Sequence, residues 1–308
     1  MNKELLDFLQ DEGIDNALLA EVRAFREKYP VSGDMTERLP KPEYYYYGRR
    51  IWELAITALL AGKNLLLSGP KATGKNVLAE NLAALFSRPM WTVSFHINTD
   101  AAWLVGTDTF DGEKVVFRPG PVWMCATEGG FGVLDEINMA KNESLAVLHA
   151  LLDFRRCLDI PGYNRVELRS ETRFIATMNH GYAGTRDLNE ALTSRFVVLD
   201  MPVMPEDDLV RLIASRYQGI SDKICSQFAK LYSELEKKAE SGEISETALD
   251  LRGLLDSIAL IEKGAASGDA LDMCLVNKSF DAYERGLIKD VIYARIPGDL
   301  TRKEVFPS

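Results

Sequence analysis

The chain has 308 residues, of which 46% are hydrophobic and 27% charged, and its formal net charge is −10. This length exceeds a typical domain of ~100–200 residues, so we expect two domains, each with its own hydrophobic core. The acidic balance argues against a nucleic acid partner and against an anionic membrane surface. The sequence contains no run of about 18 apolar residues and no signal-peptide pattern, which predicts a cytoplasmic protein.

Residues 1–43 predict a short helical leader, because apolar residues recur near helical spacing before a loop punctuated by prolines. From residue 44 to 204, strands and helices alternate. Such alternation predicts an α/β domain with a parallel sheet covered on both faces. The five expected strands are 64–68, 91–97, 131–135, 174–178 and 196–201, with helices at 50–60 and 75–86.

Two short segments interrupt this rhythm, at 107–118 and 157–168, and each carries a turn signal between candidate strands. We expect both to be β-hairpins inserted into the α/β core. Residues 205–308 predict a separate, all-helical domain. Its expected helices are 207–217, 225–238, 249–262 and 280–295.

The cysteines and histidines show no spacing that is typical of a metal site. We therefore expect the cysteines to be small buried side chains in a reducing compartment and the histidines to be structural, with His96 in a strand and His149 in a helix. The residues concerned are Cys125, Cys157, Cys225 and Cys274, and His96, His149 and His180.

The most specific motif is GPKATGK, which directly follows one expected strand and directly precedes a helix. This is the G-x-x-x-x-G-K pattern of a phosphate-binding loop, whose backbone N–H groups and helix N-terminus hold the phosphates of a nucleotide such as ATP. We expect Lys75 to reach the β and γ phosphates. The predicted binding segment comprises Gly69, Pro70, Lys71, Ala72, Thr73, Gly74, Lys75, Asn76 and Val77.

Asn76 stands where such loops usually carry a Ser or Thr that offers its hydroxyl to Mg²⁺. An amide oxygen is also a suitable ligand for this hard cation. It either replaces the hydroxyl or contacts a metal-bound water. We favour the second, because the longer side chain crowds an inner-sphere site, and we expect Asp135 to be the main anchor.

Three polar residues at the ends of expected strands complete the candidate site. Asp135 is the last residue of FGVLD, Glu136 comes directly after it, and Asn179 comes directly after FIATM. We expect Asp135 to hold Mg²⁺, Glu136 to act as general base on the attacking water, and Asn179 to orient that water. Taken alone, the two acids could simply begin a loop, and they become strong evidence only together with the phosphate-binding loop. Asn179 taken alone would be interpreted as a turn-forming residue.

Arg195 directly precedes the last expected strand, in the run LNEALTSRF. An arginine there is suited to neutralise the γ-phosphate of a nucleotide held by a neighbouring subunit. A surface salt bridge is the alternative.

Taken in order, the runs GPKATGK, PGPVW, FGVLDEINMA, FIATMNHGYAGTRDLNEALTSRF and ALDLRGLLDSI resemble the MoxR/CbbQ-type AAA+ ATPases over residues 44–265. The resemblance implies that 69–76 is Walker A, Asp135 and Glu136 are Walker B, and Asn179 is sensor 1. It further implies that Arg195 is the arginine finger and Arg252 is sensor 2 on a helical lid. The two hairpins match the helix-2 and pre-sensor-1 inserts.

The same resemblance implies a homo-oligomer, usually a hexamer, that hydrolyses ATP with Mg²⁺ to remodel or activate a protein in the manner of a chaperone. It also implies that the ring often works with a partner carrying a von Willebrand factor A domain to activate a target protein or to load a cofactor or metal into it. Three other functions remain open. A nucleic-acid motor is disfavoured by the acidic charge, and a nucleotide-gated scaffold with weak hydrolysis is suggested only by Asn76. A small-molecule kinase would not need the inserts or Arg195.

Two aromatic features each leave two interpretations. The run Tyr44–Tyr47 either lines an adenine pocket or, as we favour, packs between leader and core. Phe110, at the tip of the first hairpin, either faces a partner or packs back on its own hairpin, and we favour packing.

Overall fold

The computed structural model describes residues 3–31, 33–159, 165–179, 188–245 and 249–307. The chain divides into two compact units, Met1–Pro202 and Val203–Ser308.

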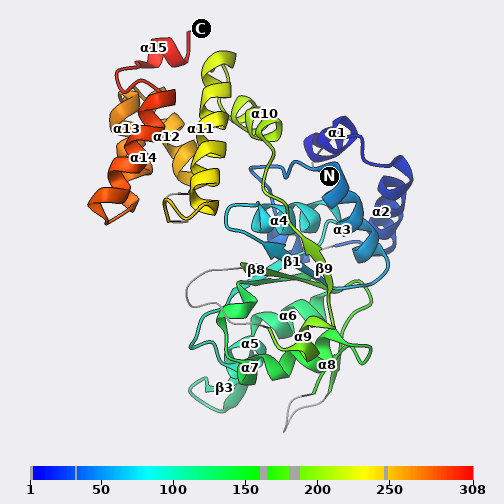
Figure 1. Cartoon of the computed structure of the whole chain (residues 1–308). Helices are drawn as coiled ribbons and strands as arrows, with labels where there is room; N and C mark the ends of the chain where they lie inside the picture. Colours follow the sequence, from blue (N-terminus) through cyan, green and yellow to red (C-terminus); the bar gives the residue numbers. More distant parts are fainter. Residues whose placement is uncertain (1–2, 32, 160–164, 180–187, 246–248, 308) are drawn as a thin grey trace. The chain divides into compact units, whose positions relative to one another are not determined.

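The first unit is built on a five-stranded parallel sheet, as predicted (Figure 1). Its spatial order is β2-β5-β8-β1-β9, so the strand before the phosphate-binding loop lies between β8 and β9. The strands are β1 (Leu65–Gly69), β2 (Met90–Ser94), β5 (Phe131–Asp135), β8 (Arg173–Asn179) and β9 (Val197–Asp200).

The second strand is shorter than the sequence pattern predicted. It was expected to reach Ile97, but β2 ends at Ser94. After Phe95 donates its N–H to the carbonyl of Asp135, the chain turns away: the His96 N–H bonds the hydroxyl of Thr99, and Ile97 is 50% exposed. The placement of His96 inside a strand was therefore wrong.

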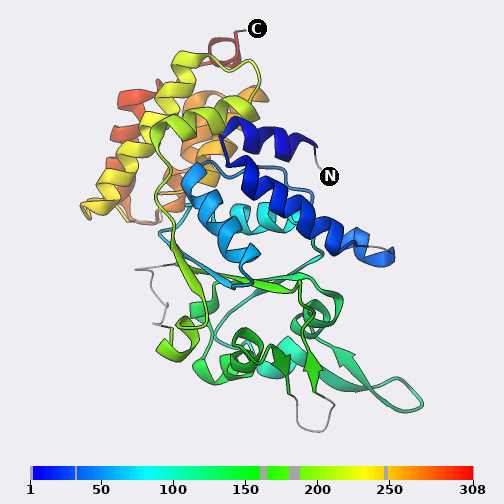
Figure 2. The same ribbon diagram turned by 90° about the vertical axis from the view of Figure 1, so that its right-hand side faces the viewer.

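Alternate side chains of the sheet supply two separate cores. Leu65, Leu67 and Ile175 face a cluster with helices α1 (Lys3–Asp11), α2 (Asn16–Lys28), α3 (Arg49–Leu60) and α4 (Lys75–Leu85). Leu66 and Ala176 face the other cluster. Its helices are α5 (Ala101–Val105), α6 (Pro121–Glu128), α7 (Asn142–Leu145), α8 (His149–Leu152) and α9 (Glu190–Thr193). Both views show helices on the two faces of the sheet (Figures 1 and 2), as expected for strands that are apolar throughout.

The leader is packed into the first core. Leu9 and Leu19 are fully buried in the same cluster as Trp52 of α3. The ring of Phe8 lies 5.0 Å from that of Tyr45, which confirms packing between leader and core for this part of the tyrosine run. A 3₁₀ turn, η1 (Gly33–Arg38), follows α2.

Both predicted hairpins are present. The first pairs β3 (Gly106–Phe110) with β4 (Val115–Pro119) and projects from the unit (Figure 2). The second pairs β6 (Cys157–Leu158) with β7 (Val166–Glu167), and its tip lies outside the described residues. Phe110 is 69% exposed, so the expectation that it packs back on its hairpin was wrong. Its partner in the register is Val115, which is 67% exposed and offers no cover.

The second unit is helical throughout its described part. Long amphipathic helices bury Phe228, Leu254 and Ile258 in its core. Its helices are α10 (Glu206–Arg216), α11 (Asp222–Glu240), α12 (Leu251–Glu262), α13 (Ser267–Cys274), α14 (Ala282–Arg295) and α15 (Arg302–Val305). The sequence pattern did not predict α13, whose eight residues include only a short apolar stretch.

Short 3₁₀ segments complete the structure: η2 (Ile137–Met139), η3 (Ala146–Leu148) and η4 (Val276–Lys278). Among the described helices, none has the length and apolar character needed to cross a membrane. All four cysteines are free; Cys125, Cys157 and Cys225 are buried, as expected, whereas Cys274 is only partly covered.

Candidate nucleotide site

The phosphate-binding loop joins the buried strand β1 to helix α4. Gly69 lies so close to Met201, the residue after β9, that a Cβ on Gly69 would come within 2.6 Å of the Met201 carbonyl oxygen. Gly74 precedes α4 with a φ of 79°, a left-handed conformation that glycine adopts most readily. A Cβ on Gly74 would also lie 3.1 Å from the ring of the buried Tyr46. Both glycines therefore have steric reasons to be where the motif requires them.

Lys75 begins α4 and folds back across the loop. Its ammonium donates to the carbonyl of Gly69 at 3.0 Å, to that of Pro70 at 2.5 Å and to the hydroxyl of Thr73 at 3.2 Å. Burial lowers the pKa of Lys75 to about 8, although the nearby carboxylates of Asp135 and Glu136 act to raise it. The lysine thus lies in a desolvated position facing both acids.

The acids lie at the carboxyl edge of the sheet, where β5 and β8 end side by side. The hydroxyl of Thr177 in β8 donates to Asp135 Oδ1 at 2.6 Å, and the Thr177 Oγ1 atom accepts the N–H of Glu136 at 3.0 Å. Glu136 has a φ of 54°, a left-handed conformation that is uncommon outside glycine. The chain turns away from the strand direction at this residue, and Glu136 is exposed at the carboxyl edge of the sheet.

Asn179, at the end of β8, meets Glu136 directly. Its side-chain amide donates to Glu136 Oε1 at 3.2 Å. The carbonyl of Asn179 in turn accepts a hydrogen bond of 3.0 Å from the amide of Asn138, which is buried in η2. The structure therefore brings the predicted general base and the predicted water-orienting amide into contact.

The oxygen donors at this edge suit Mg²⁺. Asp135 uses one carboxylate oxygen for Thr177, and Asn76 is exposed on the first turn of α4, followed by the half-buried Val77. Within the described part of the chain, no group of three or more His, Cys, Asp or Glu residues forms a closed metal cage. Mg²⁺ in nucleotide sites takes one or two carboxylates and completes its shell with phosphates and water, so this donor set fits the ion.

Arg195 lies at the opposite edge of the sheet. The register pairs Val197 with Leu65, whereas the loop begins after Gly69 at the other end of β1. At ~3.3 Å per residue, this places Arg195 roughly 15 Å or more from the loop of its own chain.

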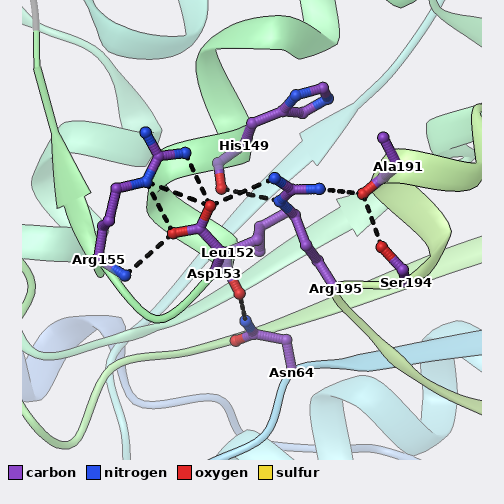
Figure 3. A network of polar contacts seen from close by, with 8 residues as sticks. All are labelled: Asn64, His149, Leu152, Asp153, Arg155, Ala191, Ser194 and Arg195. Atoms are coloured by element: carbon purple, nitrogen blue, oxygen red, sulfur yellow. Dashed lines mark hydrogen bonds and ion pairs between the residues drawn. The ribbon is translucent and has the colours of Figure 1, made fainter.

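The guanidinium of Arg195 is held by α8 and α9 (Figure 3). It donates to the carbonyl of His149 at 3.1 Å, to Asp153 Oδ2 at 3.3 Å and to the carbonyl of Ala191. Arg155 also forms an ion pair with Asp153, with an Nη2–Oδ2 distance of 2.7 Å. Hydrogen bonds from Arg155, with a further one from Arg195, hold the pKa of Asp153 well below its ordinary value. The salt bridge that the sequence left as the alternative for Arg195 is therefore present, with Asp153 as its partner, while its role as an arginine finger stays a prediction.

Comparisons with known proteins agree with this geometry. A family model of the AAA domain, dynein-related subfamily, matches residues 64–196. Over 297 residues, the chain is 34% identical to the uncharacterized protein YojN of Bacillus subtilis, covering 94% of this chain and 95% of that protein. The chain belongs to this AAA family.

Other relatives of this AAA protein come from staphylococci. It is 35% identical over 259 residues to an uncharacterized protein of Staphylococcus haemolyticus, covering 82% of this chain and 98% of that protein. A crystal structure of a candidate ATPase from Cytophaga hutchinsonii aligns over 92% of this chain and 89% of that chain, with a TM-score of 0.45 and 15% identity. The AAA domain is a nucleotide-binding domain, and its match ends at Phe196, just before β9.

Arg252 belongs to the second unit of this AAA protein. It stands on the first turn of α12, where Asp250 caps the helix by accepting the Arg252 N–H at 3.0 Å, and its side chain is exposed. Its role as sensor 2 stays a prediction.

Sequence reasoning missed the residues that hold the site together. Thr177, Asn138 and Asp153 each contact a predicted site residue that is about 40 positions away in the chain. A run such as FIATMN gives no sign that its threonine differs from any other buried strand residue. Only the pairing of β5 with β8 identifies Thr177.

Proposed function

We propose that this AAA protein hydrolyses ATP and is a MoxR/CbbQ-type ATPase that uses the reaction to remodel or activate a protein partner. One observation carries the proposal: a phosphate-binding loop, two carboxylates and an amide converge at one edge of the sheet, with Asn179 3.2 Å from Glu136. An acid aligned by an amide beside a buried lysine is the arrangement needed to direct water at a terminal phosphate.

Each residue has a distinct part in the proposed reaction. The loop backbone and Lys75 bind the β and γ phosphates. The Lys75 ammonium therefore stabilises the negative charge that develops on the leaving group. Glu136 accepts a proton from the attacking water while Asn179 holds the carboxylate in place. Mg²⁺, when bound, supplies positive charge to the phosphate oxygens. Asp135 and Asn76 are the residues that would hold it.

We further propose that subunits assemble into a ring, of the hexameric kind that the resemblance implies. The position of Arg195 at the edge away from its own loop supports this, because such an arginine can serve only the nucleotide of a neighbouring subunit. In the same proposal Arg252 contacts the nucleotide from the helical lid. A protein with a von Willebrand factor A domain is the kind of working partner that this resemblance favours, with the exposed Phe110 hairpin as the segment that faces it.

The test compares two lysines that flank β1. Lys75→Ala removes the buried ammonium, whereas Lys63→Ala removes an exposed one just before the strand. Binding of a fluorescent ATP analogue and phosphate release from ATP are measured for both variants. We expect Lys75→Ala to lose both, and Lys63→Ala to match the wild type. Wild-type protein that binds neither ATP nor ADP, or Lys75→Ala protein that releases phosphate at the wild-type rate, contradicts the proposal.

A further inference from the structure

One hydroxyl group links the two acids of the proposed site. Thr177 Oγ1 donates to Asp135 Oδ1 at 2.6 Å and accepts the Glu136 N–H at 3.0 Å. A hydroxyl has one proton to donate and two lone pairs to accept with, so a threonine can make both bonds at once. Valine, which has the same shape, can make neither.

The position of this hydroxyl is fixed by the sheet. In the register of β5 and β8, Leu134 lies opposite Ala176, so the next residue on each strand brings Asp135 beside Thr177. Thr177 is 1% exposed, which excludes water from competing for its hydrogen bonds. The contact is therefore short and held by strands on both sides.

Each bond constrains one acid in a different way. The bond to Asp135 Oδ1 orients the carboxylate and leaves Oδ2 available on the side away from the threonine. The bond from the Glu136 N–H holds the left-handed turn, with φ at 54°, that directs Glu136 toward Asn179. Without this acceptor the N–H has no partner at the end of the strand, and the turn loses its restraint.

A second bond closes the arrangement from the other side. Asn138, two residues after Glu136, is 3% exposed and donates to the carbonyl of Asn179 at 3.0 Å. The end of β8 is thus tied to the segment after β5 at both Thr177 and Asn179. The site is assembled across two strands rather than within either one.

We infer that Thr177 is the positioning residue of the nucleotide site, whose hydroxyl aligns Asp135 for the metal and Glu136 for water together. This inference rests on the proposed function. It predicts that loss of the hydroxyl weakens both roles while the phosphate-binding loop stays intact. Residues that orient the ligands of a metal typically change its affinity or the activity by ~10–100-fold when they are replaced.

The experiment uses a matched pair of buried threonines near the two ends of β8. Thr177→Val removes the linking hydroxyl. Thr172→Val removes a hydroxyl that is equally buried but has no hydrogen-bond partner. Thr177→Ser keeps the hydroxyl in a smaller side chain. Thr177→Ala lacks the hydroxyl and is similar in size to the serine variant. Binding of a fluorescent ATP analogue is titrated against Mg²⁺ and repeated in EDTA, and phosphate release is measured in parallel.

We expect Thr177→Val to raise the Mg²⁺ concentration for half-maximal binding by ~10-fold or more and to slow phosphate release by ~10–100-fold. Its binding in EDTA should stay unchanged, because the loop is untouched. Thr177→Ser and Thr172→Val should behave like the wild type. If Thr177→Val does not fold, the Ala and Ser variants decide, and a Ser variant as impaired as the Ala variant overturns the inference.

The outcomes separate this inference from the function on which it rests. If the wild type binds nucleotide equally with and without Mg²⁺, and Lys75→Ala binds it as tightly as the wild type, both the proposed function and the role of Thr177 are overturned. Wild-type protein that binds as expected, with Thr177→Val and Thr172→Val indistinguishable in every titration, overturns the role of Thr177 alone.

Discussion

At the scale of single residues, the chemistry of the site depends on how burial changes the pKa of Lys75. Burial destabilises the charged ammonium relative to the neutral amine, so the pKa of Lys75 is about 8 instead of its ordinary value near 10.5. Bound phosphates stabilise the ammonium and raise that pKa again. The protonation of Lys75 and the binding of a nucleotide are therefore linked.

The first prediction follows from the sign of this linkage. Above pH 8 the free protein increasingly holds neutral lysine, so binding must take up a proton, and affinity should fall as pH rises, by at most ~10-fold per unit. Titration calorimetry at pH 7.5 to 9.5, in buffers of different ionisation enthalpy, measures this uptake. Lys75→Arg is the control, because guanidinium stays charged throughout. Equal proton uptake by both proteins contradicts the prediction.

The second prediction concerns Asn76. Asn76→Ala should lower turnover more than ATP affinity and shift the response to Mg²⁺, since an oxygen donor near the ion is lost while the loop persists. A magnesium titration of phosphate release measures it, with Asn142→Ala, at the exposed start of α7, as the control. If Asn76→Ala matches the wild type at every concentration, Asn76 is merely a helix-start residue.

The sequence predicted this site as far as its residues lie in local motifs. The loop, Asp135, Glu136 and Asn179 each follow a recognisable strand, so position along the chain was enough. Thr177 and Asn138 could not be predicted, because their importance comes from hydrogen bonds across strands that are distant in sequence. The order of strands in the sheet decides such contacts.

At the scale of elements, the strands and long helices were predictable because their apolar residues repeat at regular spacing. The end of β2 was not, since Phe95 still bonds the sheet while Ile97 turns outward. The side chain of Phe110 was also misjudged, because a two-stranded hairpin leaves its tip with no layer to pack against.

The third prediction concerns the leader. Leu9 of α1 is fully buried against the core, so Leu9→Ala should lower the free energy of unfolding by ~2–5 kcal/mol. Leu54→Ala, on α3 where the side chain is 44% exposed, should change it by about 0.5 kcal/mol or less. Urea unfolding measures both. Equal, small effects would mean that the leader contributes little to the stability of the first unit.

At the scale of the whole molecule, the sheet separates two kinds of chemistry. The loop and acids lie at its carboxyl edge, and Arg195 with Asp153 and Arg155 lies at the other. Under the proposed function, Arg195 would therefore act on the nucleotide of a second subunit.

The fourth prediction tests this role of Arg195. Arg195→Ala should reduce phosphate release by ~10³-fold or more, as expected for an arginine finger. Mixing it with Glu136→Gln should restore part of the activity, because some interfaces then combine an intact acid with an intact arginine. Phosphate release is measured against the mixing ratio. Activity that stays at the sum of the two variants, in a protein that light scattering finds monomeric, contradicts assembly.

The most direct test of the central claim, that the carboxyl edge of the sheet hydrolyses ATP, is phosphate release by Glu136→Gln at saturating ATP and Mg²⁺. Glu143→Gln, an exposed glutamate on α7, is the matched control. The glutamine in Glu136→Gln keeps the shape of the glutamate but cannot accept the proton of the attacking water, so phosphate release should fall by ~10²–10⁴-fold. ATP affinity should be kept, and Glu143→Gln should match the wild type. Release by Glu136→Gln at the wild-type rate would contradict the account.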